Sequence, residues 1–510
     1  MRLQKYLIGV DLGTSATKAA LYQIDGKLVA EASLEVSLYY PEPGVVEQEN
    51  DDFYRTAAQT VQRCLQQSGI DSHQIAAIAF DSQMAGIGSI DGAYRPATRF
   101  DSWLDMRCQP YIEGMDQQAG KRVTELTGCA PTCDHGPKIL WWMHERPQEY
   151  ARVAKFVTPA GYVAGTMAGL KSGQAFMDYT FIHFSGFSDS QSLTWSDELC
   201  GRFGIDKNKL PEIVEPWKVV GEVSTAAARD FGLAAGTPVA AGCGDTAACA
   251  LGAGVVRPGM LFDSAGTAAV LAACTDRFVA DSKYRALICM HSVLPGLYSP
   301  LAYIAGGGLS LRWFRDEFYN TFRGQAQLAN SDLYDEMIAS AAEIPPGADG
   351  LFFSPHLGGQ ICPASPAMRG AWVGFSWGHK QAHFLRATLE SIAYEYAYYL
   401  KILRDQLPDL DFLEVRAVGG GARSGIWNQI KADVLGVPYQ RLQRSELGTW
   451  GSAMIAGKAV GLFNDLAAKA SESALPKNGL VMPDAAKCED YRPLVEKYIA
   501  LKGTLGTFFD

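Results

Sequence analysis

The chain has 510 residues, which at the usual ~100–200 residues per domain corresponds to roughly two to four domains and excludes a single small binding module. Hydrophobic residues make up 48% and charged residues 20%, a composition typical of globular proteins with a large core rather than of disordered chains. The net charge of −10 excludes a broad attraction to phosphate backbones, so we expect no nucleic-acid partner and expect any phosphorylated ligand to be held locally.

The first part of the chain predicts an antiparallel meander followed by alternating helix and strand. Residues 6–10 and 16–23 are apolar runs, and residues 28–38 alternate apolar with polar side chains after an Asp25-Gly26 turn signal. Residues 50–67 place apolar side chains at helical spacing after an Asn-Asp-Asp cap, and residues 75–80 predict a buried strand. This order predicts an α/β layer architecture.

A glycine-rich segment, residues 252–259, predicts a domain boundary, with domains at residues 1–254 and 255–510. Residues 261–274 resemble residues 10–21, because each stretch enters through an apolar strand with an aspartate, turns at Gly-Thr and leaves through a second apolar strand. Internal duplication and a chance match of a short segment are both open interpretations. Later, two helices at 384–403 and 427–435 and a strand at 415–418 predict that the second half is α/β too.

The eleven cysteines are scattered along the chain, which favours free thiols in a reducing compartment. Cys129 and Cys133 lie four residues apart, but no second Cys or His pair at zinc-site spacing follows, so we interpret them as ordinary buried thiols. The N-terminal segment lacks a signal-peptide pattern, and the longest weakly charged run, residues 237–256, is interrupted by Asp245 and by glycines. We therefore expect a cytoplasmic protein without a membrane span.

Two Gly-Thr turns are candidates for holding phosphate. In the first, Gly13 lets backbone N–H groups approach a phosphate, Thr14 and Ser15 offer hydroxyls, and Asp11 is placed to hold a hydrated Mg²⁺. Gly266 and Thr267 would form a symmetric partner to it. Neither a GxGxxG fingerprint nor a Walker loop is present, and a plain hairpin turn is the alternative interpretation.

A glycine run and an aspartate between glycines are further candidates. Residues 419–424, Gly-Gly-Gly-Ala-Arg-Ser, follow a predicted strand and precede a helix, so a flat ring could lie against the backbone there; a simple helix N-cap loop is the alternative. Asp245, between Gly244 and small residues, has room for a substrate hydroxyl whose proton it could accept. An N-cap role for Asp245 is the other interpretation, and the two are compatible.

Polar groups at a strand end suit a polyol. Gln83 follows the strand at residues 75–80, and Trp103 and Asp105 lie some twenty residues further on, where an indole face and hydrogen bonds could hold hydroxyls. A surface ion pair between Asp105 and Arg107 is the alternative.

Together these residues resemble the FGGY family of carbohydrate kinases, and within it the xylulokinase-like members, from residue 6 to about residue 462. GVDLGTS at residues 9–15 is similar to the family's first phosphate loop, SAGT at 264–267 to its second, and GGGARS at 419–424 to its adenosine motif. The resemblance implies two ribonuclease H-like domains of the actin-like ATPase superfamily around a central cleft, with ATP and Mg²⁺ as cofactors.

The resemblance also implies roles for individual residues. Asp245 would be the catalytic aspartate, and Asp11, through water, and Asp245 would serve the metal. The implied sugar contacts are Gln83, Met84, Ala85, Trp103, Asp105 and Asp245. The implied nucleotide contacts are Gly13, Thr14, Ser15, Lys18, Gly266, Thr267, Gly308, Arg312, Gly420, Gly421, Ala422 and Ser424.

Two departures from the xylulokinase pattern concern the substrate. Ala85 stands where Gln-Met-His-Gly would place a histidine, and residues 358–363 read Gly-Gly-Gln-Ile-Cys-Pro instead of Ser-Gly-Glu-Arg-Thr-Pro. We expect ATP-dependent phosphorylation of a ketopentose such as D-xylulose, with another ketose, a polyol, an aldonate or an autoinducer-like dione as alternatives. An actin-like ATPase and a non-catalytic sugar-binding relative are alternatives of other classes. The expected partners are the small-molecule substrate and ATP, and a homodimer is possible.

Overall fold

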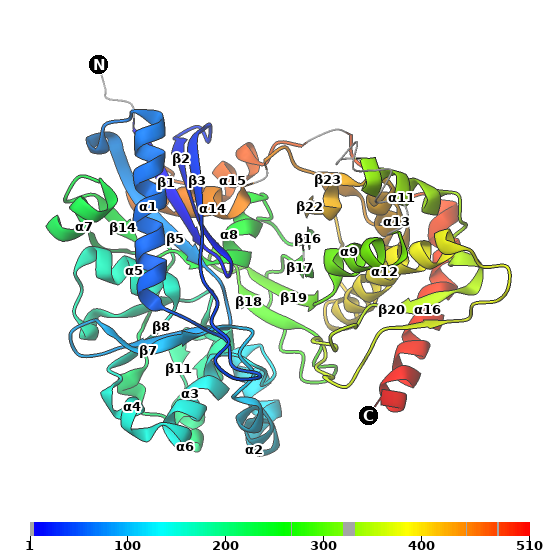
Figure 1. Cartoon of the computed structure of the whole chain (residues 1–510), viewed down its shortest axis with the longest axis horizontal. Coiled ribbons are helices and arrows are strands. Elements are labelled where there is room, and N and C mark those ends of the chain that lie inside the picture. The colour runs from blue at the N-terminus through cyan, green and yellow to red at the C-terminus, as the bar shows by residue number, and fades with distance from the viewer. Residues whose placement is uncertain (1–4, 267, 320–331, 445, 477–478, 510) are drawn as a thin grey trace.

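The computed structural model describes residues 5–266, 268–319, 332–444, 446–476 and 479–509. The N-terminal half and the second half lie side by side, each built around its own sheet (Figure 1). The first sheet has the order β13-β14-β5-β1-β2-β3, with β15 paired to β5. Its strands are β1 (Tyr6–Leu12), β2 (Ala16–Gln23), β3 (Leu28–Glu35), β5 (Ile75–Ser82), β13 (Val219–Glu222), β14 (Pro238–Ala240) and β15 (Cys243–Gly244).

The second sheet has the order β18-β19-β17-β16-β22-β23. Its strands are β16 (Met260–Ala265), β17 (Ala269–Ala273), β18 (Ile288–His291), β19 (Tyr298–Ile304), β22 (Glu414–Val418) and β23 (Tyr439–Arg441). The central strand β16 pairs antiparallel with β17 and parallel with β22, just as β1 pairs antiparallel with β2 and parallel with β5. This shared arrangement favours duplication over a chance match, and the α/β expectation is confirmed.

A smaller sheet and three strand pairs complete the β-structure described. The order β4-β7-β6-β8 is formed by β4 (Glu47–Gln48), β6 (Ile87–Ile90), β7 (Pro96–Asp101) and β8 (Lys155–Val157). The pairs are β9 (Phe176–Asp178) with β12 (Glu212–Val214), β10 (Ser188–Asp189) with β11 (Thr194–Trp195), and β20 (Phe352–Ser354) with β21 (Ala371–Val373).

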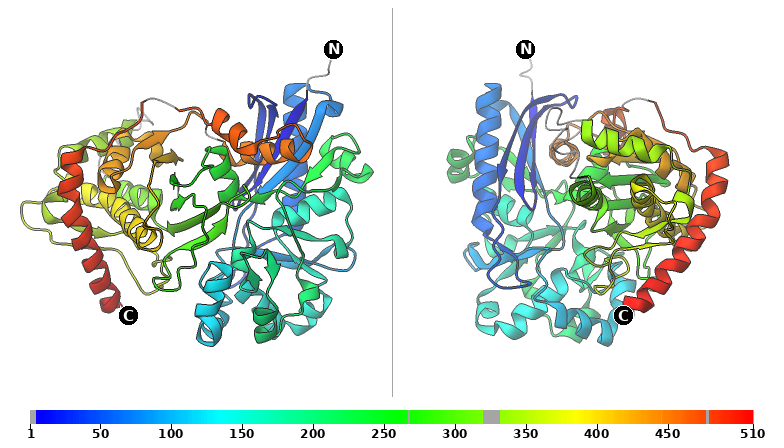
Figure 2. Two further views of the ribbon diagram at one scale, coloured as in Figure 1. Left: turned by 180° about the vertical axis from the view of Figure 1, so that it is seen from behind. Right: turned by 45° about the vertical axis from the view of Figure 1, so that its right-hand side comes forward.

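Helices cover the sheets. Those of the first half are α1 (Asn50–Ser68), α2 (Gln109–Thr127), α3 (His135–Glu145), α4 (Pro147–Arg152), α5 (Pro159–Ala168), α6 (Asp197–Phe203), α7 (Thr225–Phe231) and α8 (Asp245–Gly252). Those of the second are α9 (Gly307–Phe318), α11 (Asp332–Ala342), α12 (Gln381–Gln406), α13 (Gly425–Leu435), α14 (Leu447–Ala459), α15 (Leu466–Ser473) and α16 (Ala485–Phe509). In Figure 2, α16 runs along the outer side of the second half.

The expected elements match the structure with one difference in capping. The helix predicted at 50–67 is α1, but Glu49 occupies its N-cap position and offers no side-chain cap. Asn50, expected to belong to the cap, donates instead from its side chain to the carbonyl oxygen of Thr98 at 2.8 Å. The Asn-Asp-Asp cap was therefore a wrong prediction, because a tertiary contact engages the asparagine. Asp25-Gly26 does form the turn, with Gly26 at φ +97°.

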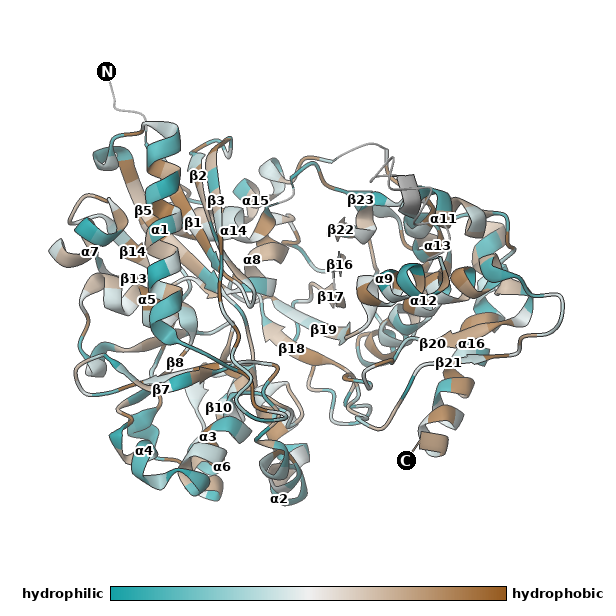
Figure 3. Cartoon of the chain, viewed as in Figure 1, coloured by the Kyte–Doolittle hydropathy of each residue, from teal (hydrophilic) through white to brown (hydrophobic). Residues whose placement is uncertain are grey.

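One helix of the second half returns to the first sheet. Helix α14 packs on β1 and β5 and against α8, on the face opposite α1 (Figure 1). Glycines allow this approach: a Cβ at Gly9 would lie 1.8 Å from the Thr449 carbonyl oxygen, and one at Gly451 would lie 2.1 Å from that of Ala248. Strands β1 and β5, on which α14 packs, are largely apolar (Figure 3). The domain boundary at residue 254 stays a prediction. Helix α14 comes after that residue in the sequence but packs on the sheet of the first half.

Candidate active site

Three carboxyl groups lie at the ends of neighbouring strands of the first sheet. Asp11 on β1 and Asp81 on β5 are register partners in a parallel pair, and β15, which pairs with β5 at Asp81 and Ser82, leads directly into Asp245. Because the carboxyl ends of parallel strands meet at one edge of a sheet, this edge is where α/β proteins bind ligands. Asp81 was not among the expected site residues.

Burial raises the pKa of all three carboxyl groups. Burial raises the pKa of Asp11 to about 7, with a further increase from the charge of Asp245, while Lys18 lowers it. Burial raises the pKa of Asp245 to about 6, although hydrogen bonds from Thr246 lower it. Asp81 is fully buried, and burial together with the Asp11 charge holds its pKa well above the usual range. Such crowding favours a bound cation or a transferable proton.

The start of α8 is held by residues that no sequence signal indicated. The backbone N–H of Gly244 donates to the hydroxyl of Thr180 at 2.9 Å, and that hydroxyl donates to Asp178 at 2.5 Å. Burial raises the pKa of Asp178 to about 7. The Thr246 backbone N–H and hydroxyl both donate to one oxygen of Asp245. Gly244, rather than Asp245, is the N-cap residue.

The first Gly-Thr turn joins β1 to β2. The hydroxyl of Thr14 donates to Gln83 at 3.3 Å and accepts from the indole N–H of Trp103 at 2.9 Å, while its carbonyl accepts from the Gln48 side chain at 3.0 Å. Ser15 is exposed. The hydroxyl of Thr14, expected to face phosphate, is therefore also part of a network with two expected sugar contacts.

Lys18 lies on β2 opposite Asp11 in the register. Its Nζ forms an ion pair with Glu446, 3.3 Å away, just ahead of α14. The pair joins the first hairpin to the segment that returns from the second half.

The second Gly-Thr turn joins β16 to β17. The N–H of Gly308 donates to the Gly266 carbonyl at 2.8 Å, and a Cβ at Gly308 would lie 2.4 Å from that oxygen, so the start of α9 is held against the turn. Thr267 lies outside the described residues. Arg312 is exposed on α9.

The glycine run at 419–421 divides into two kinds of position. Gly420 has helical backbone angles and open space around a built Cβ, whereas a Cβ at Gly421 would lie 2.7 Å from both Ala265 and the Trp427 ring. Ala422 is buried, and Ser424 caps α13 by accepting from the Trp427 N–H at 3.1 Å. The N-cap interpretation is thus correct for Ser424, and Gly420 keeps the space that a ligand would need.

The expected sugar contacts lie around β5. Gln83 is buried and donates to Gln48 at 2.8 Å, and Met84 lies against Gly244, where a built Cβ would be 2.6 Å from its side chain. Ala85 has φ +61°, a left-handed conformation that is uncommon for a non-glycine residue. Trp103 keeps 37% of its surface exposed.

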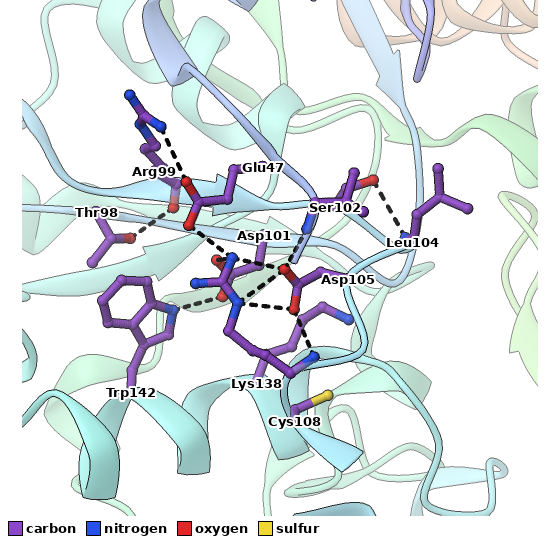
Figure 4. A network of polar contacts seen from close by, with 12 residues as sticks. Glu47, Thr98, Arg99, Asp101, Ser102, Leu104, Asp105, Cys108, Lys138 and Trp142 are labelled. Carbon is purple, nitrogen blue, oxygen red and sulfur yellow. Dashed lines mark hydrogen bonds and ion pairs between the residues drawn. The ribbon is translucent and has the colours of Figure 1, made fainter. Parts of the chain in front are cut away.

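Asp105 and Arg107 belong to a buried network rather than a surface pair. Figure 4 shows Asp105 within this network, with Glu47 and Asp101 nearby. Asp105 accepts from the Val46 N–H at 2.7 Å and from the Arg107 guanidinium at 2.7–3.0 Å. Arg107 also donates to Glu47 at 2.7 Å. The surface ion-pair alternative is therefore wrong. A direct contact of Asp105 with sugar stays a prediction. In the structure, the hydrogen bonds of Asp105 hold the segment that carries Trp103.

Comparison with known proteins accounts for both halves of the chain. Residues 6–252 match the N-terminal domain, and residues 264–460 the C-terminal domain, of the "FGGY family of carbohydrate kinases". The chain belongs to this family. The fold is accordingly the two-domain, actin-like α/β fold of FGGY sugar kinases, as the resemblance implied, and the chain is a carbohydrate kinase by family.

Individual relatives share about a quarter of their residues with this FGGY kinase. A xylulose kinase and a gluconokinase of Bacillus subtilis (strain 168) are each 27% identical, covering 97% and 99% of this chain and 96% of each relative. The crystal structure of xylulose kinase from Rhodospirillum rubrum superposes with a TM-score of 0.89 at 27% identity, covering 99% of this chain and 100% of that one. Within the described ranges, none of the helices combines the length and apolar composition that a membrane crossing requires.

Proposed function

We propose that this FGGY kinase transfers the γ-phosphoryl group of ATP to a hydroxyl of an open-chain sugar, with a ketopentose such as D-xylulose as the first candidate. The observation that carries the proposal is the placement of Asp245 at the start of α8, beside Asp11 and next to the strand end that bears Gln83 and Met84. A base at this point would have the substrate hydroxyl on one side and the two Gly-Thr turns, which are proposed to hold phosphate, on the other.

Asp245 is proposed as the general base. Its carboxyl is half-buried, and one oxygen is oriented by Thr246, which leaves the other free to accept a proton from the substrate hydroxyl. A pKa of about 6 keeps it ionised at neutral pH while making it a better proton acceptor than an ordinary aspartate. General-base assistance of this kind accelerates a reaction by about 10²–10⁴-fold. Alignment of the hydroxyl with the phosphate would provide further rate acceleration.

The nucleotide is proposed to lie between the two Gly-Thr turns and the glycine run. Gly13 and Gly266 would let backbone N–H groups approach the phosphates, and the open space at Gly420 would admit the adenine ring. The other proposed nucleotide contacts in this region are Lys18, Gly308, Arg312, Gly421, Ala422 and Ser424. Thr267 is retained as a proposed contact on sequence alone.

Mg²⁺ fits the donor set at the strand ends, since Asp11 and Asp245 offer the oxygen ligands that this ion prefers. Among the residues described, no three His, Cys, Asp or Glu side chains are grouped closely enough to hold a metal ion by themselves. Asp11 would therefore hold the ion through water, with Asp245 nearby. When bound, the ion would neutralise phosphate charge during transfer.

The choice of sugar is the open part of the proposal. The xylulose kinase and the gluconokinase of B. subtilis are equally similar to this chain, so an aldonate is the second candidate. Ala85 removes the side chain that a histidine would offer, and a buried site rejects substrates that leave polar groups unmatched. Histidine tolerates the left-handed backbone found at this position, so Ala85→His is expected to raise the rate with D-xylulose.

One assay tests the proposal: ADP release from Mg-ATP with a panel of ketoses, polyols and aldonates. We expect ADP release to require a panel member, with D-xylulose or D-gluconate among the best. ADP release that needs no sugar would favour an actin-like ATPase instead. Sugar binding by calorimetry without ADP release would favour a non-catalytic relative. If D-xylulose is among the best substrates and Ala85→His only lowers its rate, the interpretation of Ala85 is wrong.

A further inference from the structure

Two cysteines from different segments meet beneath the segment that carries Trp103 and Asp105. Cys108 is the N-cap residue of α2, and Cys133 lies just before α3. Their sulfur atoms are 3.8 Å apart. The interpretation of Cys133 as an ordinary buried thiol is therefore incomplete, although it holds for Cys129, which is 2% exposed.

A buried ammonium group lies against this pair. Lys138 is fully buried, and its Nζ donates to the carbonyl oxygen of Cys133 at 2.8 Å and lies 3.1 Å from the Cys133 sulfur. The carbonyl oxygen of Asp105 is the further partner of that sulfur. Lysine beside a sulfur stabilises the thiolate, which is the reactive form of cysteine.

The two thiols differ in acidity and in exposure. The hydrogen bond from Cys108, followed by the charge of Lys138, lowers the pKa of Cys133 to about 6, against opposing effects of burial and of Asp105. The same hydrogen bond raises the pKa of Cys108, and Asp134 adds to that increase. Cys133 is half-buried whereas Cys108 is fully buried. For each of the nine other cysteines, burial raises the pKa.

We propose that Cys108 and Cys133 are a peroxide-sensitive pair that forms a reversible disulfide and thereby displaces residues 102–107. Cys133 is assigned as the attacking residue because it keeps some exposed surface, whereas Cys108 keeps none, and because its sulfur lies beside the Lys138 ammonium group. Cys108 is the resolving residue because its sulfur lies against Cys133 and away from solvent.

The chemistry balances with a peroxide as the two-electron oxidant. The Cys133 thiolate attacks the terminal oxygen of the peroxide, so that an S–O bond forms, the O–O bond breaks, and water or an alcohol leaves. The sulfenic acid then reacts with Cys108: the S–S bond forms, the S–O bond breaks, and the departing hydroxide takes the Cys108 proton as water. Two thiols are oxidised and one peroxide is reduced. Once Cys133 is a neutral sulfenic acid, the thiolate charge that opposed ionisation of Cys108 is gone.

Closing the disulfide must move the substrate segment. A disulfide needs a sulfur separation of about 2.05 Å, so the two sulfurs must approach by about 1.7 Å. The movement removes the Cys133 contacts with Lys138 and with the Asp105 carbonyl, and it pulls on Cys108, which directly follows Arg107. Arg107 holds Asp105 in place. Resting on the proposed function, we expect the oxidised protein to phosphorylate sugar several-fold more slowly.

The test treats the folded, full-length protein with hydrogen peroxide and maps its thiols by alkylation and mass spectrometry. Trypsin would release Cys108 in peptide 108–121 and Cys133 in peptide 123–138, and fragmentation of the second distinguishes Cys133 from Cys129. We expect a Cys108–Cys133 cross-link that dithiothreitol removes, and eleven alkylatable thiols falling by two. In Cys108→Ser, a cyclic 1,3-dione should trap the sulfenic acid on Cys133. Cys488→Ser, a half-buried cysteine on α16, should behave as wild type.

The outcomes separate this proposal from the proposed function. Absence of the cross-link, together with alkylation of Cys133 at pH 7 no faster than that of Cys488, would overturn the pair as a redox site, whatever the kinase assay shows. A cross-link that leaves the sugar-dependent rate unchanged would overturn the coupling to residues 102–107. A cross-link in a protein that releases no ADP with any sugar, reduced or oxidised, would support the redox pair and count against the proposed function alone.

Discussion

Trp103 donates a hydrogen bond from its indole nitrogen to the hydroxyl of Thr14, 2.9 Å away and 89 residues earlier in the chain. The same hydroxyl donates to Gln83 at 3.3 Å. Thr14 belongs to the first Gly-Thr turn, which is proposed to hold phosphate, and Trp103 and Gln83 are proposed sugar contacts. One hydroxyl group therefore links the turn proposed to hold phosphate with two side chains proposed to hold the sugar.

Replacing Trp103 by Phe should keep an aromatic face and remove the N–H donor. The net value of one such hydrogen bond, about 0.5–1.5 kcal/mol, corresponds to a loss of roughly 2- to 12-fold in kcat/KM. Thr14→Val removes the hydroxyl that accepts this hydrogen bond. In a double-mutant cycle measured by coupled ADP assay, Trp103→Phe should therefore lower kcat/KM less in the Thr14→Val background than in the wild type. Fully additive losses would mean that the two residues act independently.

Asp245→Asn should abolish phosphoryl transfer while leaving the fold intact, because the amide keeps the shape but cannot accept a proton. The expected fall in kcat is at least about 10²–10⁴-fold, with sugar affinity by calorimetry nearly unchanged. Asp197→Asn is the matched control, since Asp197 is also the first residue of a helix, α6, but is exposed. Retention of more than half of the wild-type rate in Asp245→Asn would remove Asp245 from the mechanism.

The acid limb of the kcat/KM profile should follow the carboxyl groups of the site. Asp245 must be ionised to accept a proton, and its pKa is about 6, so activity should fall as the pH drops through 6, with the Asp11 pKa of about 7 broadening the fall. The Thr246 hydroxyl stabilises the charged form and lowers the Asp245 pKa. Thr246→Val should therefore move the acid limb to higher pH. Thr225→Val, at the exposed start of α7, should not move it; an unmoved limb in Thr246→Val would speak against Asp245 as the titrating base.

Gly420→Leu should block nucleotide without unfolding the protein. The backbone at Gly420 is helical, with φ −62°, and nothing lies within 4 Å of a built Cβ, so the side chain would occupy only the proposed ligand space. The wild type should be stabilised by Mg-ADP in a thermal-shift experiment, and this variant should not. Gly503→Leu, at an equally open glycine on α16, is the control and should respond like the wild type. A wild-type response in Gly420→Leu would place the nucleotide elsewhere.

Gly421→Ala provides a contrast within the same motif. Its Cβ would lie 2.7 Å from Ala265 and from the Trp427 ring, so the melting temperature itself should fall without ligand. An unchanged melting temperature would show that this packing can relax.

Local patterns in the sequence determined much of this protein. Apolar periodicity and turn residues predicted β1, β2, β5 and the helices α1, α12 and α13 to within a few residues. The glycine motifs indicated the family, and Asp11 and Asp245 were predicted as site carboxylates, because short motifs carry their own backbone requirements. Periodicity and turn chemistry act over a few residues, so a single segment is enough to reveal them.

Only the tertiary structure decided which distant segments meet. The parallel register of β1 and β5 places Asp81 beside Asp11. Helix α14 brings Ser452, 371 residues after Asp81, close enough for its hydroxyl to donate to Asp81 at 2.6 Å. Burial of Asp105 with Arg107, and the approach of Cys133 to Cys108, are likewise products of packing. A pairing between remote segments depends on sheet register and on close helix approach through glycines such as Gly9 and Gly451. No local pattern around Asp81 or Cys133 carries that information, because the energy of each contact arises only when the partner segment arrives.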